Sequence, residues 1–184
     1  GLQYFMNDID DATIASRSRK HLVYNAIPFL VCFLTFLISL LFANGWAVDP
    51  TTGVISVEPF KYLNNLLAMP VIAAMLLVGV LAVLWGIGTG IFKGSRKSIW
   101  FSGSGTVLTV LSLLLLAGFN NTAYYPSLSD MQSSLTIYNS SSSLFTLEAM
   151  SIVSIFIPFV VAYIWYSWRA MNRKPITRQE IESD

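Results

Sequence analysis

Four long runs without charged side chains near their centres limit what this chain can fold into. The runs cover residues 22–43, 66–92, 99–119 and 147–168, and their single charge is Glu148, near the start of the last run. The shortest run has 21 residues. A helix of that length spans about 31 Å, which is enough to cross a hydrocarbon core of roughly 30 Å. We therefore predict an all-α integral membrane protein in which four transmembrane helices form a bundle.

The composition supports a membrane protein and excludes other classes. Hydrophobic residues make up 54% of the chain and charged residues 11%, whereas soluble domains have about 25% charged residues. The low share of charged residues excludes an ordinary soluble domain. The high share of hydrophobic residues excludes a disordered segment, because such a chain can bury enough apolar surface to fold. The formal net charge is +1, so no basic excess attracts phosphates and we expect no nucleic acid partner.

Basic residues fall on one side of the predicted helices, and cytoplasmic loops of membrane proteins retain such residues. Ten of the eleven Lys and Arg lie before the first run, between the second and third, or after the fourth. Lys61 alone lies in the loop at 44–65, and the loop at 120–146 has none. We therefore predict that both ends of the chain are cytoplasmic and that these two loops lie outside.

The chain divides into three parts on this interpretation. Residues 1–21 form a cytoplasmic leader, residues 22–168 form the four-helix domain, and residues 169–184 form a cytoplasmic tail. Residues 1–6 are apolar and aromatic and precede a charged stretch, as the last turn of an earlier membrane helix would. We expect this start to be a cut end, with further membrane helices upstream.

Each predicted helix carries a stripe of small or weakly polar residues at spacings of three and four, which places them on one helix face. Small residues let backbones approach closely, so we expect the stripes to face protein rather than lipid. A substrate path would need ionisable groups in mid-membrane, and the runs have none there. The stripes comprise Asn25, Pro28, Cys32, Thr35 and Ser39; Gly79, Ala82, Gly86 and Gly90; Ser102, Thr106, Thr109 and Ser112; and Glu148, Ser151, Ser154, Pro158 and Ala162.

Three prolines are expected to kink the helices, namely Pro28, Pro70 and Pro158.

Residues that usually carry chemistry are scarce. His21 is the only histidine and lies at the cytoplasmic boundary, so we interpret it as a solvated interfacial residue rather than a haem ligand. Cys32 is the only cysteine and cannot form an internal disulfide. We interpret Glu148 as stabilising the start of the last helix through the helix dipole, with a proton-exchanging group as the alternative. We therefore predict no catalytic, cofactor-binding or metal-binding residue in this chain.

The loop at 120–146 is too long for a simple helix connection, and it mixes Ser, Asn and Thr with apolar and aromatic residues. We expect it to pack on the outer surface of a partner. It contains Asn120-Asn121-Thr122-Ala123-Tyr124-Tyr125-Pro126, followed by Ser134-Leu135-Thr136-Ile137, Ser142-Ser143, Thr146-Leu147 and Met150, and then Pro158, Tyr163 and Trp165. The pattern resembles the C-terminal region of subunit II of cytochrome bd-type quinol oxidases, particularly the Bacteroidetes-like branch. Further residues extend the resemblance over nearly all of the chain, namely Leu2-Gln3-Tyr4-Phe5, Arg17-Ser18-Arg19, Asn64-Asn65 and Met69-Pro70.

This resemblance implies that the chain is the C-terminal half of an eight-helix membrane subunit in a bacterial plasma membrane. The complete complex would oxidise quinol at the outer surface and reduce dioxygen to water, with b-type and d-type haems held by subunit I. The partners of the chain would be that haem-bearing subunit, the N-terminal half of subunit II, membrane lipid and quinone. The chain itself would be a noncatalytic scaffold. The alternatives are half of an inverted-repeat membrane transporter and a standalone four-helix membrane adaptor.

Overall fold

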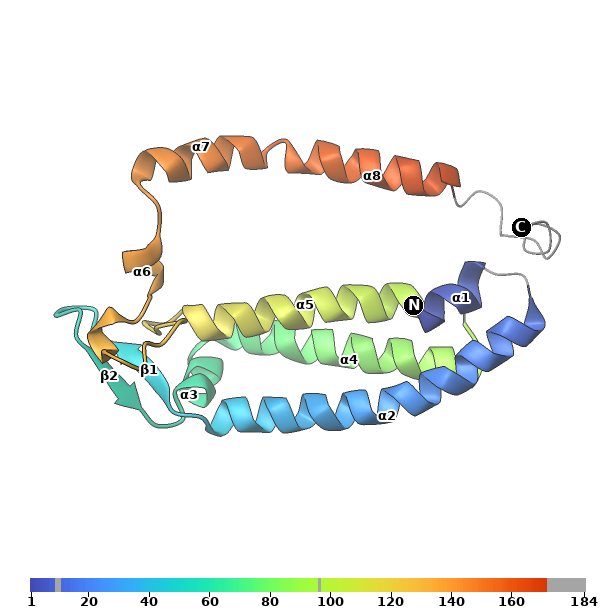
Figure 1. The fold of residues 1–184 in the computed structure, drawn as a ribbon, viewed down its shortest axis with the longest axis horizontal. Helices are drawn as coiled ribbons and strands as arrows, with labels where there is room; N and C mark the ends of the chain where they lie inside the picture. Colours follow the sequence, from blue (N-terminus) through green and yellow to red (C-terminus); the bar gives the residue numbers. More distant parts are fainter. Residues whose placement is uncertain (9–10, 96, 172–184) are drawn as a thin grey trace.

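The computed structural model describes residues 1–8, 11–95 and 97–171, which are mostly helical (Figure 1). The elements in chain order are α1 (Leu2–Asp8), α2 (Ala12–Phe42), β1 (Gly45–Val48), β2 (Ile55–Glu58), α3 (Lys61–Ala68), α4 (Pro70–Lys93), α5 (Ser98–Gly118), η1 (Met131–Ser133), α6 (Ile137–Ser140), α7 (Leu144–Ser154) and α8 (Ile157–Met171). The three long helices α2, α4 and α5 run along one another, while α7 and α8 stand apart from them.

Four helical segments are long and apolar enough to cross a membrane, as predicted. They are Ala12–Phe42, Pro70–Lys93, Ser98–Gly118 and Leu144–Met171, the last of which comprises α7 and α8. The prediction of an all-α membrane fold is therefore confirmed. The predicted tail is described only as far as Met171. Several basic residues used to predict the orientation lie outside the described residues, namely Arg96, Arg173, Lys174 and Arg178.

The first long helix starts ten residues before its apolar run. Asp11 is its N-cap, and its carboxylate accepts hydrogen bonds from the backbone N–H groups of Thr13 (2.7 Å) and Ile14 (3.1 Å). These bonds satisfy two of the donors that every helix start leaves unpaired. The basic residues of the predicted leader therefore lie on the first turns of α2. Pro28 lies inside this helix without ending it.

The second apolar run contains a break that its hydrophobicity does not reveal. α3 ends at Ala68 and α4 begins at Pro70, with Met69 between them in a non-helical conformation (φ −119°, ψ 76°). A proline ring disfavours helical geometry at the preceding residue, and proline fits the first turn of a helix, where no N–H is needed. The predicted start of this span at residue 66 is therefore wrong. The span begins at Pro70, and residues 66–68 belong to α3.

The last apolar segment is interrupted between α7 and α8. Pro158 has no N–H to donate to the carbonyl one turn earlier. The backbone around the break makes tighter hydrogen bonds instead, from residue i to residue i−3, such as Phe156 N to the Val153 carbonyl (3.0 Å). Pro158 thus divides the span into two helices.

Glu148 does not hold the position that the sequence predicted. α7 begins at Leu144, and the Ser143 side chain caps it by accepting a hydrogen bond from Thr146 N (3.4 Å). Glu148 therefore lies in the second turn, and it is exposed. The helix dipole stabilises a carboxylate mainly in the first turn. The interpretation of Glu148 as a residue that stabilises the helix start is therefore wrong.

α4 and α5 pack so closely that side chains are excluded from parts of their contact. A Cβ atom added to Gly79 would lie 2.8 Å from the backbone nitrogen of Thr109. One added to Gly86 would lie 2.6 Å from the backbone nitrogen of Ser102. Real Cβ atoms essentially never lie so near other atoms, so only glycine fits at these two positions. The stripes predicted on these two helices therefore face each other, apart from Thr106, which is exposed, while Gly105 beside it packs against Gly79 and Ala82.

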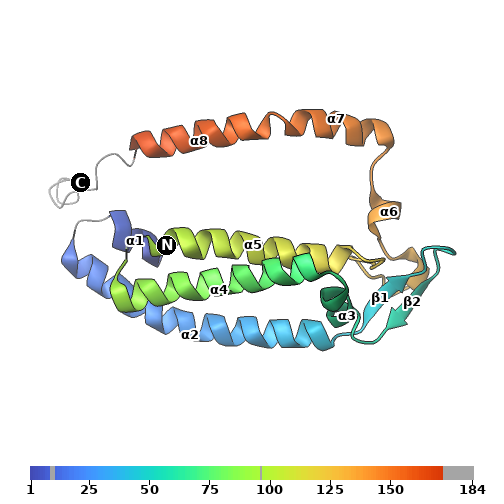
Figure 2. The ribbon, with the colours of Figure 1, turned by 180° about the vertical axis from the view of Figure 1, so that it is seen from behind.

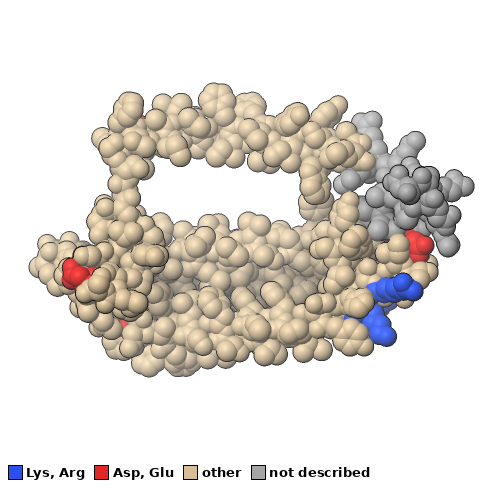
Figure 3. Space-filling model, viewed as in Figure 1, with Lys and Arg blue, Asp and Glu red and all other residues tan. Residues whose placement is uncertain are grey.

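The stripes of the other two spans face no helix of the described chain. All stripe residues of α2 are exposed, and so is every residue of α7 and α8 except Ser167. An opening passes between this last segment and the other helices in the space-filling view (Figure 3). The ribbon seen from behind also shows α7 and α8 apart from the other helices (Figure 2). That these two stripes face protein stays a prediction.

α1 packs at one end of the long helices and connects to α4 and α5. The side chain of Gln3 is buried there, and its Nε2 donates to the Gly86 carbonyl (3.3 Å) and to Ser102 Oγ (3.0 Å). Ser98 Oγ is buried nearby on α5, and it is the one buried side-chain polar atom of the described residues that lacks a hydrogen-bond partner. α1 is therefore bound to the same glycine seam that joins α4 and α5.

We expect Gly86→Val to destabilise the protein, because the new side chain would meet the backbone of Ser102. The free energy of unfolding should fall by about 1–3 kcal/mol. Gly103→Val is the matched control, since a Cβ at Gly103 has no atom within 4 Å. Thermal unfolding of the protein, purified with its native partners in mild detergent, measures both variants. Equal stability of the two variants would contradict the close packing of α4 and α5.

Candidate functional site

The end of the helices remote from α1 is covered by a cap, which we define as residues 45–68 and 118–140. It holds β1, β2, α3, η1 and α6. The two strands pair antiparallel, with Gly45 opposite Glu58, and an isolated bridge from Ala47 to Thr122 joins the second part of the cap to the hairpin. The sequence predicted only loops at 44–65 and 120–146. The cap thus contains strands and short helices in the two segments that were predicted to be loops.

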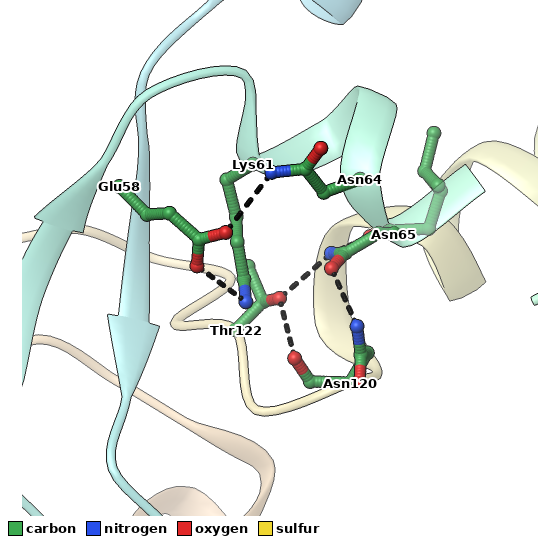
Figure 4. A network of polar contacts seen from close by, with 7 residues as sticks. Glu58, Lys61, Asn64, Asn65, Asn120 and Thr122 are labelled. Carbon is green, nitrogen blue, oxygen red and sulfur yellow. Dashed lines mark hydrogen bonds and ion pairs between the residues drawn. The ribbon is translucent and has the colours of Figure 1, made fainter. Parts of the chain in front are cut away.

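Asn65 is the centre of a buried polar network in the cap (Figure 4). It is fully buried, and its Nδ2 donates to Thr122 Oγ1 (2.8 Å) and to the Leu116 carbonyl (3.1 Å). Its Oδ1 accepts a hydrogen bond from Asn120 Nδ2 (2.9 Å). Buried amides need such partners because water cannot replace them. Asn65 therefore ties α3 to the end of α5 and to the turn that follows.

That turn holds two successive residues in the left-handed backbone region, Asn120 (φ 58°) and Asn121 (φ 54°). Asparagine adopts this region more readily than other side-chain-bearing residues. The Asn120 side chain is bound to Asn65, and the Asn121 carbonyl accepts a hydrogen bond from Val48 N (2.8 Å). Contacts from both α3 and β1 therefore hold the strained turn in place.

Lys61 is buried in the cap, although the sequence predicted only a loop residue there. Its side chain is 8% exposed, and its Nζ lies 3.0 Å from Glu58 Oε2. Asn64 Nδ2 donates to the other carboxylate oxygen of Glu58 (3.0 Å). The hydrogen bonds from Lys61 and Asn64 lower the pKa of Glu58 below its usual value, while burial raises the pKa of the neighbouring Tyr62. A buried charge without a partner destabilises a protein, so the buried ammonium group of Lys61 needs the Glu58 carboxylate beside it.

The hairpin turn has its own carboxylate. One oxygen of Asp49 accepts hydrogen bonds from Thr51 N (2.8 Å) and Thr51 Oγ1 (2.7 Å), and the other accepts one from Thr52 Oγ1 (2.8 Å). These donors lower the pKa of Asp49 to about 2. Gly53, with φ 71°, completes the turn in a backbone conformation that suits glycine. The side chain of Asp49 therefore stabilises the hairpin turn.

Part of the loop at 120–146 packs on the hairpin of its own chain. Gln132 Nε2 donates to the Ile55 carbonyl (2.8 Å), and Gln132 Oε1 accepts from Ile55 N (2.9 Å), as a paired strand would. The sequence did not predict this contact. Other side chains of the loop point outward, including Leu128, which is 95% exposed, and Tyr138, which is 82% exposed. Contact between this loop and a partner stays a prediction.

Two adjoining hollows of about 290 Å³ and 450 Å³ lie between the hairpin turn and α6. They share Val48, Asn121, Thr136 and Tyr138 in their walls. Asp49 is the only ionisable group with a charge at neutral pH among the described residues that line them, and its oxygens already accept hydrogen bonds. These hollows offer neutral hydrogen bonding and no paired acid and base.

Metal-binding side chains form no cluster in the described part of the chain. No three His, Cys, Asp or Glu side chains come together there. His21 is exposed on α2 with its ring edge-on to Tyr24 (6.5 Å between centroids), and Cys32 is also exposed. That the chain contributes no catalytic, cofactor-binding or metal-binding residue stays a prediction.

A family model described as cytochrome bd terminal oxidase subunit II matches residues 1–171. The chain belongs to this family. No curated protein matches it. As a subunit II chain it is part of a quinol oxidase complex, an oxidoreductase of the respiratory chain that has other subunits. Its four apolar segments make it a multi-pass membrane protein. The resemblance inferred from the sequence is thereby confirmed.

The cap brings together two segments of subunit II that carried this resemblance separately. Asn64-Asn65 and Asn120-Asn121-Thr122 are joined by the hydrogen bonds of Asn65. No periodicity relates positions so far apart in the chain, so sequence reasoning missed this contact. It also missed the ion pair between Lys61 and Glu58, although these residues are only three positions apart. The available signal was the presence of Asn65 and Lys61 in an apolar setting, where polar side chains need partners.

We expect Asn65→Leu to destabilise the cap strongly, because it leaves the buried Thr122 hydroxyl and the buried Leu116 carbonyl without the amide that donates to them. The free energy of unfolding should fall by about 2–3 kcal/mol. Asn64→Leu is the matched control, since Asn64 is exposed and loses only its bond to Glu58. Its effect should stay below about 1 kcal/mol. Denaturant unfolding of the detergent-purified protein distinguishes them, and equal losses would refute the central position of Asn65.

We expect Glu58→Gln to destabilise the protein in a pH-dependent way. A lowered pKa means that the carboxylate contributes stability above its ordinary range of about 4.3 and loses it as the pH falls through the lowered value. The melting temperature of Glu58→Gln should therefore lie below that of the parent at pH 7, and the two should converge in acid. Adding Lys61→Met to this variant should restore stability, because no buried charge is then left unpaired. A pH-independent difference would contradict the ion pair.

Proposed function

We propose that this chain is a noncatalytic scaffold portion of subunit II, which supports quinol oxidation and the reduction of dioxygen to water by holding a haem-bearing subunit I. The exposed state of α7 and α8 carries the proposal. Their span of 28 residues has no buried residue in the described chain. Its small residues, among them Ala162, line one face and favour contact with another helix over contact with lipid.

The chemistry of the complex would then lie outside this chain. In the complete complex, b-type and d-type haems held by subunit I would carry electrons from quinol to dioxygen. The residues of this chain supply packing surfaces instead. Its spans keep ionisable side chains away from mid-membrane, since His21 lies near the start of α2 and Glu148 near the start of α7. Such spans suit a support for a redox partner better than a proton path.

We also propose that the cap faces the outside of a bacterial plasma membrane and that both chain ends are cytoplasmic. The basic residues of the described chain lie at the end of the helices opposite the cap, apart from Lys61. Blue side chains gather at that end in Figure 3. Lys61 does not oppose this orientation, because Glu58 neutralises its charge within the cap. The arrangement follows the positive-inside tendency of membrane proteins.

Half of an inverted-repeat transporter is the weaker candidate. The break between α7 and α8 is a feature that carriers share, because their interrupted helices bind substrate and ions. Pro158 accounts for this break, however, and the residues around it are apolar or hydroxylated. A carrier would be expected to have an ionisable group there.

The first test is a reduced-minus-oxidised absorption spectrum of the intact complex, purified from its own membranes through a C-terminal tag. A larger subunit that co-purifies with b-type and d-type haem bands supports the proposal. A haem-free preparation that retains its partners overturns it.

The scaffold role predicts a result for Ala162→Phe, which places a bulky ring on the small-residue face of α8. Haem recovered per tagged chain should fall roughly tenfold, which corresponds to about 1.4 kcal/mol of lost association energy. Turnover per haem in the complexes that do assemble should be unchanged. Val160→Phe is the matched control, because residue 160 lies on the opposite face of the same helix. Normal haem recovery with lower turnover per haem would indicate a catalytic role instead.

A further inference from the structure

We infer that α4 binds one acyl chain of an anionic phospholipid in a groove near the end that adjoins α1, with the headgroup held by Lys93. The groove has a volume of about 380 Å³. Apolar side chains form most of its wall, among them Leu81, Leu84, Trp85 and Phe92, and Lys93 lies at its end. This lipid site goes beyond the scaffold role and does not depend on it.

The wall of the groove suits an acyl chain. Trp85 is 61% exposed and Phe92 is 81% exposed, so both rings are open to the surroundings of the helix. Thr89 also lines the groove, but its hydroxyl donates to the Trp85 carbonyl (2.8 Å) and is not free for a ligand. Within the span, the groove therefore offers mainly apolar contact, with the indole N–H of Trp85 as a further donor.

Gly88 gives the groove its depth. Gly79 and Gly86 are required by the contact with α5, but a Cβ at Gly88 would have no atom within 4 Å. Packing within the described chain therefore does not explain Gly88, and a glycine inside a helix is about 0.5–1 kcal/mol less favourable than alanine. The missing side chain leaves a notch between Trp85 and Phe92. An acyl chain lying across α4 fits such a notch.

Lys93 is free to bind a phosphate. It is the last residue of α4, and Gly94 follows it in the left-handed conformation that ends the helix. The Arg19 guanidinium donates to the carbonyls of Ile91 and Phe92 (2.9 Å for the latter), so Lys93 is not needed to satisfy the helix end. Within the described residues the only ion pair is that of the cap. Lys93 therefore has no carboxylate partner there.

Charge complementarity selects an anionic lipid as the occupant. Arg19, Lys93 and Lys97 belong to the same end of the helices, where Figure 3 shows basic side chains together. A basic residue that reaches an anionic headgroup at this level attracts it by about 1 kcal/mol, which corresponds to about fivefold in affinity. Of these three residues, only Lys93 lines the groove. Because the groove lies within the span, its ligand comes from the bilayer rather than from the aqueous phase.

The test measures phospholipid bound to the intact membrane assembly that contains this chain. The parent is incubated in mild detergent with equal amounts of phosphatidylglycerol and phosphatidylcholine that have the same acyl chains, and bound lipid is counted by native mass spectrometry. The parent should prefer phosphatidylglycerol. Lys93→Gln should retain about fivefold less of it, while Lys93→Arg and the control Lys97→Gln should retain the parental amount. Glycerol phosphate at equal concentration should displace none of it.

Gly88→Leu tests the acyl-chain part of the site by filling the notch. It should lower retention of both lipids, whereas Gly103→Leu, which fills an equally open position on α5, should not. Parental retention in Lys93→Gln or in Gly88→Leu would overturn the inference. An equal loss in Lys97→Gln and Lys93→Gln would overturn it too, because charge alone would then attract the lipid. Displacement by glycerol phosphate would identify a phosphate site without an acyl-chain groove.

Discussion

Direct backbone contact between α4 and α5 is the interaction on which the rest of this structure depends. Lipid tails are as apolar as leucine, so membrane helices gain little from hiding apolar side chains and associate mainly through close packing. Gly79 and Gly86 allow that packing because they place nothing between the two backbones. α1 is bound to the same seam through Gln3. The position of the cap follows from it as well, since the cap joins α3, which precedes α4, to the end of α5.

The cap solves a different physical problem at the other end of the helices. Its backbone is irregular, and its buried carbonyls and amides need partners that a helix would supply by itself. Gln132 supplies two of them by pairing with both polar groups of Ile55 as a strand would. Asn65 donates to the Leu116 carbonyl at the end of α5 and to the Thr122 hydroxyl of the following turn. The ion pair of Lys61 neutralises the one basic charge in the cap. Polar residues thus make compact structure possible where the chain leaves the apolar spans.

Hydrophobic runs and residue spacing predicted the parts of the fold that depend on neighbouring residues in the chain. The apolar runs located four spans, and small-residue spacing predicted faces of α4 and α5 that contact protein, without predicting that these two faces contact each other. The Met69-Pro70 pair is a signal for the break before α4. The predicted span nevertheless began at residue 66, because the prediction followed the hydrophobic run and not the proline. The hairpin was missed although its two strands are close together in the sequence. Its contacts with Thr122 and Gln132 come from residues remote in the sequence, which local patterns do not predict. For the same reason, an amide in an apolar setting indicated that Asn65 needs hydrogen-bond partners, but the sequence did not identify those partners.

The separation of α7 and α8 from the other helices bears on how the subunit is made. α2, α4, α5 and the cap precede α7 in the chain, so they are synthesised first, and their described contacts need nothing from it. On the proposed scaffold role, biogenesis proceeds in two stages, and the last span is covered only when its partner binds. Unassembled membrane helices of this kind are substrates for quality-control proteases. The cellular amount of the subunit would then follow the amount of its partner.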